Sequence, residues 1–168
     1  MPLASLLSDL RRRGTLRVPG TAVFLTADQS SAPVVLLHHL KHNKALHEQV
    51  VLLSIVNVDI PAVELEQRVS VTRLDEGFVR VKAVYGFMET PNVPQVLALC
   101  AERHGLKVQP MHTSYYLNRE RLLPTGTNHM ARWRKKLFVF MSRNAQPATQ
   151  FFGLPPNRVV ELGAQVEL

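Results

Sequence analysis

The pattern of apolar and polar positions predicts a strand, a helix and a second strand in the first third of the chain. Nearly continuous apolar runs at 21–26 and 49–58 predict strands that are covered on both faces. Between them, Ser31 as an N-cap and Pro33 as a helix-starting proline predict a helix over 33–46, with a buried apolar first turn. These three elements predict a βαβ unit with two parallel strands.

After Pro61 the pattern becomes a strict alternation of apolar and polar residues. It covers segments 68–74 and 78–85, which Asp75, Glu76 and Gly77 connect. This arrangement predicts an antiparallel hairpin with one buried face and one solvated face. The buried face of the second strand would carry Val79, Val81, Ala83 and Tyr85.

Helical spacing of apolar residues returns in three further segments. It predicts helices over 3–13, 93–104 and 129–145. Two more strands are expected at 112–117 and 158–168, the last with a bulge at Gly163. The prediction is therefore a single α/β domain: a mixed sheet with a parallel βαβ unit, an antiparallel hairpin and flanking helices.

Charge and composition narrow the function classes. The formal net charge of +7 suggests an anionic neighbour: a nucleic acid, a phosphorylated ligand or the inner membrane surface. The single cysteine, Cys100, excludes an internal disulfide, fits a reducing compartment and lies on the apolar stripe of its predicted helix. No apolar run approaches the roughly 18–20 residues of a membrane span, and the charges at 11–13 follow a stretch too short for a secretory signal.

Residues 38–49 contain four of the seven histidines and raise the question of a metal site. His38 and His42 have the i, i+4 spacing that can chelate zinc, but no HExxH pattern or second cysteine completes a ligand set. We interpret these histidines as surface or capping groups near the end of a helix. GxSxG, P-loop and GxGxxG patterns are also lacking, so we expect no catalytic residue, no metal and no cofactor.

Two groups of polar residues are candidates for binding. The first is the loop after the first strand, where an anion or a nucleotide can meet the start of a helix. Asp28 would repel phosphate but accept a hydrogen bond from a ribose hydroxyl, which favours a nucleotide over free phosphate. This candidate ligand loop consists of Thr26, Asp28, Gln29, Ser30 and Ser31. The second is a basic surface of Arg11, Arg12, Arg13, Arg132, Lys136 and Arg143.

Nucleic-acid binding is one use of such a basic surface. The basic face of the 129–145 helix would contact phosphates, and Tyr115 and Tyr116 would stack on bases. The other interpretation is a solvated helix face and two strand tyrosines, one of them in the core.

Several segments in order resemble the Kup family of potassium uptake permeases, in the soluble C-terminal region that follows the membrane helices. The segments are RVPGTAVFLT (17–26), LLHHLKHNKALHEQVVLL (36–53), VYGFMETPNVP (84–94), TSYYLNRE (113–120), WRKKLFVFMSRNA (133–145) and FFGLPPNRVVELGAQVEL (151–168). His39 departs from the family's HNLKHNK phrase, which has asparagine at that position.

The resemblance implies a cytoplasmic domain of a proton-coupled potassium uptake transporter, which regulates or braces the membrane core and transports nothing by itself. Residues 1–16 would be a linker or short helix after the membrane region, and 17–168 the domain proper. The implied partners are the membrane-spanning region of the same polypeptide, the inner membrane surface, a second copy and a nucleotide second messenger such as cyclic di-adenosine monophosphate, but no nucleic acid.

Two expectations remain beside this implication. The fold is expected to resemble the universal-stress-protein-like tails of some transporters, although the chain lacks their glycine-rich phosphate motif. The alternative function is a soluble basic nucleic-acid-binding domain. A reading frame that encodes about a dozen apolar spans upstream would exclude it.

Overall fold

The computed structural model describes residues 1–28, 30–123 and 147–167, with side chains at all of these except 119–123 and 164–167. The helices are α1 (Leu3–Arg13), α2 (Val34–Asn43), α3 (Val93–His104) and the one-turn α5 (Ala148–Phe151). The strands are β1 (Leu16–Leu25), β2 (Ala45–Val58), β3 (Val69–Arg73), β4 (Phe78–Gly86), β5 (Thr113–Leu123) and β6 (Val159–Glu167). Short 3-10 turns cover Leu65–Gln67, Pro110–His112 and Pro156–Arg158.

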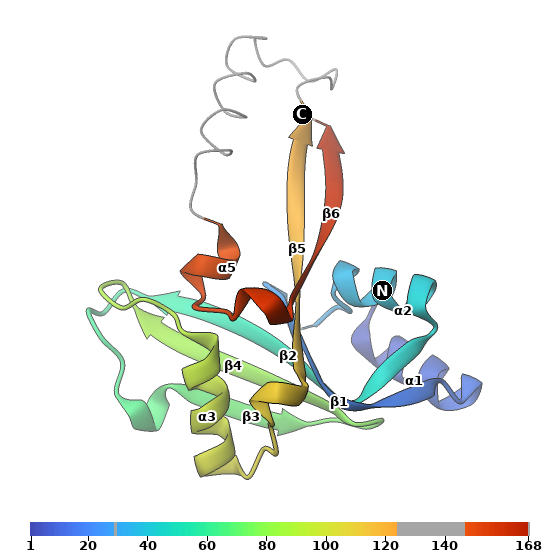
Figure 1. Ribbon diagram of the computed structural model, residues 1–168. Helices are drawn as coiled ribbons and strands as arrows, with labels where there is room; N and C mark the ends of the chain where they lie inside the picture. Colours follow the sequence, from blue (N-terminus) through green and yellow to red (C-terminus); the bar gives the residue numbers. More distant parts are fainter. Residues whose placement is uncertain (29, 124–146, 168) are drawn as a thin grey trace.

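The six strands form one mixed sheet in the order β3-β4-β2-β1-β5-β6 (Figure 1). Only β3 is antiparallel to its neighbour, β4, and the other neighbouring pairs are parallel. The predicted mixed sheet, βαβ unit and hairpin are therefore confirmed. From β1 the chain builds first toward β2 and β4, then returns to the other side of β1 with β5. The carboxyl end of β1 and the part of β5 that lies beside it thus form a topological switch point, the usual ligand position in open α/β sheets.

Helices cover both faces of the sheet, and each strand sends alternate side chains to them. On one face, α3 packs Val96 and Cys100 against strand residues such as Val23 and Val81. On the other, α1 and α2 cover Phe24 and its neighbours. The two apolar cores explain why the central strands have continuous apolar runs. The α1 residues in the second core are Leu3, Leu6 and Leu10.

Strand β5 continues well beyond its contact with β1. It pairs with β1 only at Thr113–Tyr116, whereas it pairs with β6 from Tyr115 to Leu123. The outer part of β5 and β6 therefore projects from the sheet as a two-stranded ribbon (Figure 1).

Helix α2 differs from its predicted form at both ends. Ser31 is not the N-cap, because Pro33 occupies that position, and Val34 is 52% exposed rather than buried. The helix ends at Asn43 instead of 46, because Lys44 takes a left-handed conformation with φ 54° and donates its backbone N–H to Leu40. Strand β2 follows at once, so helix and strand meet at a single residue.

Other predicted elements have clear outcomes. The helices over 3–13 and 93–104 are confirmed. The predicted bulge at Gly163 is wrong, because Gly163 pairs with Arg119 in unbroken parallel register. The helix predicted over 129–145 lies outside the described residues.

Candidate functional site

A cavity of about 490 Å³ opens at the switch point of the sheet. The end of β1 and inner positions of β2 and β5 line it on the sheet side, and the starts of α2 and α5 line it on the other. The lining residues are Leu25, Thr26, Ala27, Asp28, Ser31, Ala32, Pro33, Val34, Val35, Leu53, Ile55, Leu117, Asn118, Ala148 and Phe152. Three residues of the predicted ligand loop, Thr26, Asp28 and Ser31, line this cavity.

The loop is organised around the Asp28 carboxylate. Its Oδ1 accepts hydrogen bonds from the Ser30 backbone N–H at 2.8 Å and from the Ser30 hydroxyl at 2.7 Å, and its Oδ2 accepts one from the Ser31 hydroxyl. The Thr26 hydroxyl donates to the Asp28 carbonyl at 2.8 Å. The Ser31 hydroxyl, followed by Ser30, lowers the pKa of Asp28 to about 2. The loop thus uses its own polar groups internally.

The chemistry of the cavity favours a neutral, partly apolar group. Asp28 is its single charged residue among those that the structure describes, and its carboxylate is already hydrogen-bonded. No described lining residue is Lys, Arg or His, so a phosphate would meet one negative charge and no positive side chain. The structure brings Thr26, Asp28, Ser30 and Ser31 together, while Gln29 lies outside the described residues.

The structure describes only the first three residues of the predicted basic surface. Arg11, Arg12 and Arg13 are exposed in the last turn of α1, where positive charge complements the helix dipole. Arg12 also donates to Asp9 at 2.8 Å. The other predicted members, Arg132, Lys136 and Arg143, lie outside the described residues.

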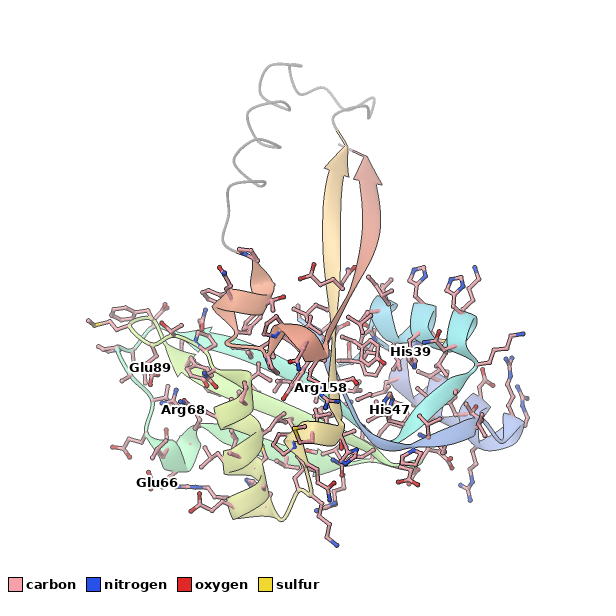
Figure 2. The ribbon with its side chains drawn as sticks, in the orientation of Figure 1. His39, His47, Glu66, Arg68, Glu89 and Arg158 are labelled. Carbon is pink, nitrogen blue, oxygen red and sulfur yellow. The ribbon has the colours of Figure 1, made fainter. Side chains whose placement is uncertain are left out.

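The histidine-rich segment divides into exposed and buried members. His38 and His42 are exposed on α2 with ring centroids 6.2 Å apart, and no group of three or more metal-binding side chains occurs among the described residues. His39 is only 7% exposed, so its interpretation as a surface or capping group is wrong. His39 is labelled on α2 in Figure 2. Its ring lies edge-on to that of Tyr116, with ring centroids 4.8 Å apart.

His47 from β2 approaches the buried side of His39, with ring centroids 6.3 Å apart. Burial lowers the pKa of both rings, and the neighbouring His47 lowers that of His39 further. The His47 Nδ1 has no hydrogen-bond partner within the described part of the chain. Both imidazoles are therefore held neutral by the fold.

Tyr115 and Tyr116 do not form a stacking surface. They are 4% and 7% exposed and lie in the two opposite cores. Burial raises the pKa of both phenols. The interpretation as strand tyrosines is confirmed, although both, rather than one, lie in a core.

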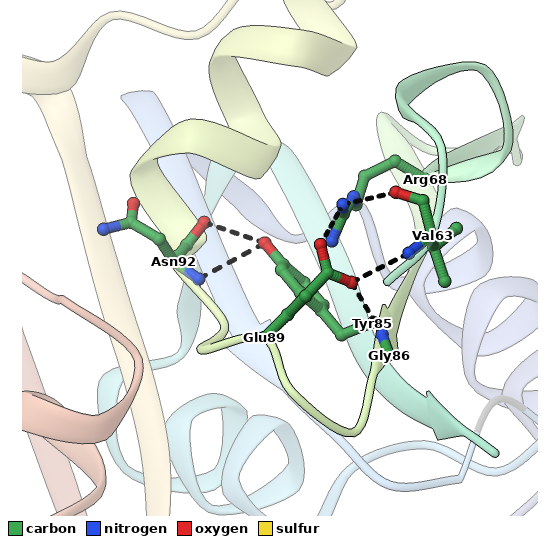
Figure 3. A network of polar contacts seen from close by, with 6 residues as sticks. All are labelled: Val63, Arg68, Tyr85, Gly86, Glu89 and Asn92. Atoms are coloured by element: carbon green, nitrogen blue, oxygen red, sulfur yellow. Dashed lines mark hydrogen bonds and ion pairs between the residues drawn. The ribbon is translucent and has the colours of Figure 1, made fainter. Parts of the chain in front are cut away.

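A second polar site, which the sequence did not suggest, lies after β4. The Glu89 carboxylate accepts hydrogen bonds from the Gly86 N–H at 2.7 Å, from the Val63 N–H at 3.0 Å and from the Arg68 guanidinium (Figure 3). Arg68 also donates to the Val63 carbonyl at 2.6 Å and stacks over the Tyr85 ring. We call these five residues the Arg68–Glu89 brace.

The brace joins two segments that are distant in sequence. The Arg68 guanidinium and the N–H groups of Gly86 and Val63 lower the pKa of Glu89 to about 2. A Cβ atom at Gly86 would lie 2.4 Å from the Pro61 carbonyl oxygen, so the close approach of the two segments requires glycine. The brace fixes the loop from 59 to 68 against the connection between β4 and α3.

Comparison with known proteins gives consistent matches over nearly the whole chain. A family model described as "K+ potassium transporter C-terminal domain" matches residues 19–168. Three proteins named as probable potassium transport system proteins Kup or Kup 1 are 58%, 55% and 52% identical, from Anaeromyxobacter sp. (strain Fw109-5), Myxococcus xanthus and Geobacter sulfurreducens. They match 99–100% of this chain, which spans only 26% of their length.

No solved structure matches the chain, and the expected likeness to universal stress proteins is not confirmed. Within the described residues, every helix is too short or too polar to cross a membrane.

Proposed function

Because the chain belongs to the family of potassium transporter C-terminal domains, we propose that it is the cytoplasmic regulatory and interaction domain of a proton-coupled potassium uptake transporter. In this proposal the membrane-spanning region of the same polypeptide moves the ion. The domain contacts that region, changes its activity and catalyses no reaction. The boundary between a leader at 1–16 and the domain at 17–168 is part of the proposal.

The observation that carries the proposal is a fold built on two buried cores within one quarter of the relatives' length. Helices cover both faces of the sheet, so the central strands bury their apolar side chains without a further layer. Such a unit supports a role separate from the transport core. The family match supplies the link to potassium transport.

The basic end of α1 supports a position beneath the bilayer. Arg11, Arg12 and Arg13 are exposed together, and cytoplasmic segments near membrane helices carry an excess of Lys and Arg that meets anionic headgroups. This is our reason to favour a membrane neighbour over nucleic acid as the partner of the charged surface.

Two further partners are hypotheses to be tested: a second copy of the chain, and a nucleotide at the Asp28 loop, where the absence of a positive side chain among the described lining residues disfavours its phosphates. Calorimetry of the chain with ATP, AMP and cyclic di-adenosine monophosphate tests the nucleotide, with Asp28→Asn as the matched variant. Heat that is lost in Asp28→Asn supports the site, and no heat at high micromolar ligand excludes it. Sedimentation over a range of concentrations tests the second copy.

Potassium uptake tests the central proposal. The chain replaces the matching C-terminal quarter of the Myxococcus xanthus relative, in a bacterial strain without other potassium uptake. We expect the chimera to support uptake and a version without the domain to show an altered rate at equal membrane abundance. Equal uptake with and without the domain would exclude a regulatory role.

A further inference from the structure

Large apolar side chains are exposed on the two segments that the Arg68–Glu89 brace joins. Phe87 is 64% exposed, Met88 is 75% exposed and Ile60 is 47% exposed, and Leu65 in the neighbouring 3-10 turn is also exposed. The Phe87 N–H donates to the Ile60 carbonyl at 2.9 Å, and the Met88 N–H donates to the Pro61 carbonyl at 3.1 Å. We call Ile60, Leu65, Phe87 and Met88 the apolar tip. Ile60, Phe87 and Met88 lie on the two loops that these hydrogen bonds join, and Leu65 lies further along the first loop, at the start of the 3-10 turn.

The brace holds this surface in one conformation. The Glu89 carboxylate accepts hydrogen bonds from two backbone N–H groups. One belongs to Gly86, directly before Phe87, and the other to Val63, between Ile60 and Leu65. Arg68 donates a hydrogen bond to the Glu89 carboxylate, and its guanidinium stacks over the Tyr85 ring (Figure 3). Because the backbone is already fixed, binding through these exposed side chains costs little further backbone entropy, which is typical of protein interaction sites.

The charge around the apolar tip is opposite to that of the chain as a whole. Segments 59–67 and 86–92 contain no Lys or Arg, although the chain carries +7. Asp59 and Glu64 are exposed there, while the negative charges of Glu66 and Glu89 are paired with Arg103 and Arg68. Anionic lipid headgroups would be repelled by this rim, and a basic protein surface would be attracted.

We propose that the apolar tip docks on an apolar protein surface bordered by Lys and Arg, at the cytoplasmic ends of the transporter's membrane helices. These ends combine apolar residues with the excess positive charge of cytoplasmic loops. The inference rests on the proposed function and adds the contact through which the domain acts. The acidic rim selects the basic border, and Phe87 and Met88 supply the apolar anchors.

Cysteine accessibility tests the contact. Met88→Cys is introduced into the isolated chain and into the Myxococcus xanthus chimera without its other reactive cysteines, and a charged maleimide measures the labelling rate. Cys100 is buried and burial raises its pKa to about 11, so it stays unlabelled. We expect labelling to be about tenfold slower in the chimera, which corresponds to about 1.4 kcal/mol of protection. Met111→Cys, 70% exposed and before β5, is the matched control and should label equally in both.

Three outcomes overturn the inference. The first is equal labelling of Met88→Cys in the chain and the chimera. The second is protection that requires anionic lipid in nanodiscs, or that appears in the isolated chain as its concentration rises, because a bilayer or a second copy would then be the partner. The third is protection that survives Asp59→Lys with Glu64→Lys, because the basic border would then be irrelevant.

Potassium uptake by the same chimera separates this inference from the proposed function. Uptake that depends on the domain, together with an unprotected Met88→Cys, overturns only the docking surface. Protection of Met88→Cys, together with uptake that does not depend on the domain, overturns only the regulatory role.

Discussion

The loops that follow β1 and β4 lie at the carboxyl ends of parallel strands, and each is organised by a carboxylate with a pKa near 2. The partners of Asp28 are two and three residues away. The partners of Glu89 include Arg68 and Val63, which are 21 and 26 residues away. The first loop therefore holds its shape by local bonds, whereas the second exists only when two distant segments dock.

Substitution of Gly86 should cause the largest loss of stability, because the loop after β4 depends on the docking of two distant segments. In Gly86→Ala the new methyl group would meet the backbone oxygens of Pro61 and Ile60, so we expect a loss of about 2–3 kcal/mol in the free energy of unfolding. Urea denaturation measures it. Gly14→Ala is the control, since nothing lies within 4 Å of its Cβ position, and its positive φ should cost about 1 kcal/mol. A smaller loss at Gly86 than at Gly14 would mean that the two segments separate freely.

Removal of the Arg68 guanidinium should have the next largest effect. Arg68→Met keeps an apolar chain over Tyr85 but loses the bonds to Glu89 and Val63, at a cost of about 2 kcal/mol. Arg103→Met is the matched control, because Arg103 pairs at 3.6 Å with the exposed Glu66 and should contribute less than about 0.5 kcal/mol. Equal urea midpoints for the two variants would show that the brace does not stabilise the fold.

Mild acid should destabilise the fold through the two histidines packed near β1, His39 and His47, and not through the Arg68–Glu89 brace after β4. Burial lowers the pKa of His39 and His47 in the folded state, so the unfolded chain binds more protons below its histidine pKa of 6.5. Stability is therefore complete above pH 6.5 and falls as the pH decreases further, by up to about 1.4 kcal/mol per pH unit for each histidine.

Urea midpoints at several pH values between 7.5 and 5 measure this slope. His39→Asn should make it shallower, and the same change at the exposed His38 should leave it unaltered. Identical slopes in both variants would show that the buried imidazole does not control the response.

The pKa values of the two carboxylates should distinguish the two loops most clearly, in an experiment that does not depend on a large change in stability. In Ser31→Ala the pKa of Asp28 should rise toward 3.8 while that of Glu89 stays near 2. In Arg68→Met the reverse is expected, with the Glu89 pKa rising toward 4.5. Side-chain carbon NMR follows both groups, and a joint change in either variant would mean that the loops are coupled.

The same contrast explains how much could be predicted from the sequence. The βαβ unit, the hairpin and α3 follow from patterns within a few residues, and so does the position of the Asp28 loop. The brace could not be predicted in this way, because Arg68 and Glu89 are 21 residues apart and each appears in the sequence as an ordinary surface charge.

The end of α2 and the burial of His39 show the same limit. Lys44 adopts a left-handed conformation where glycine is the usual signal, so no residue pattern indicated that the helix ends at Asn43. His39 was interpreted as a surface group because His38 and His42 are exposed. It is one residue after His38 on the helix, however, so its side chain points in a different direction and contacts Phe24 and Tyr116.

The position of β1 between two partners has a consequence for the order of folding. Thr21 pairs with Gln49 on one side and with Thr113 on the other, so the two pairings close chain segments of very different length. Shorter closures cost less entropy and form earlier. We expect β1, α2, β2 and β4 to be native-like in the transition state for folding, and β5 with β6 to join afterwards. Substitutions in β1 should then slow folding, while those in β5 should mainly accelerate unfolding.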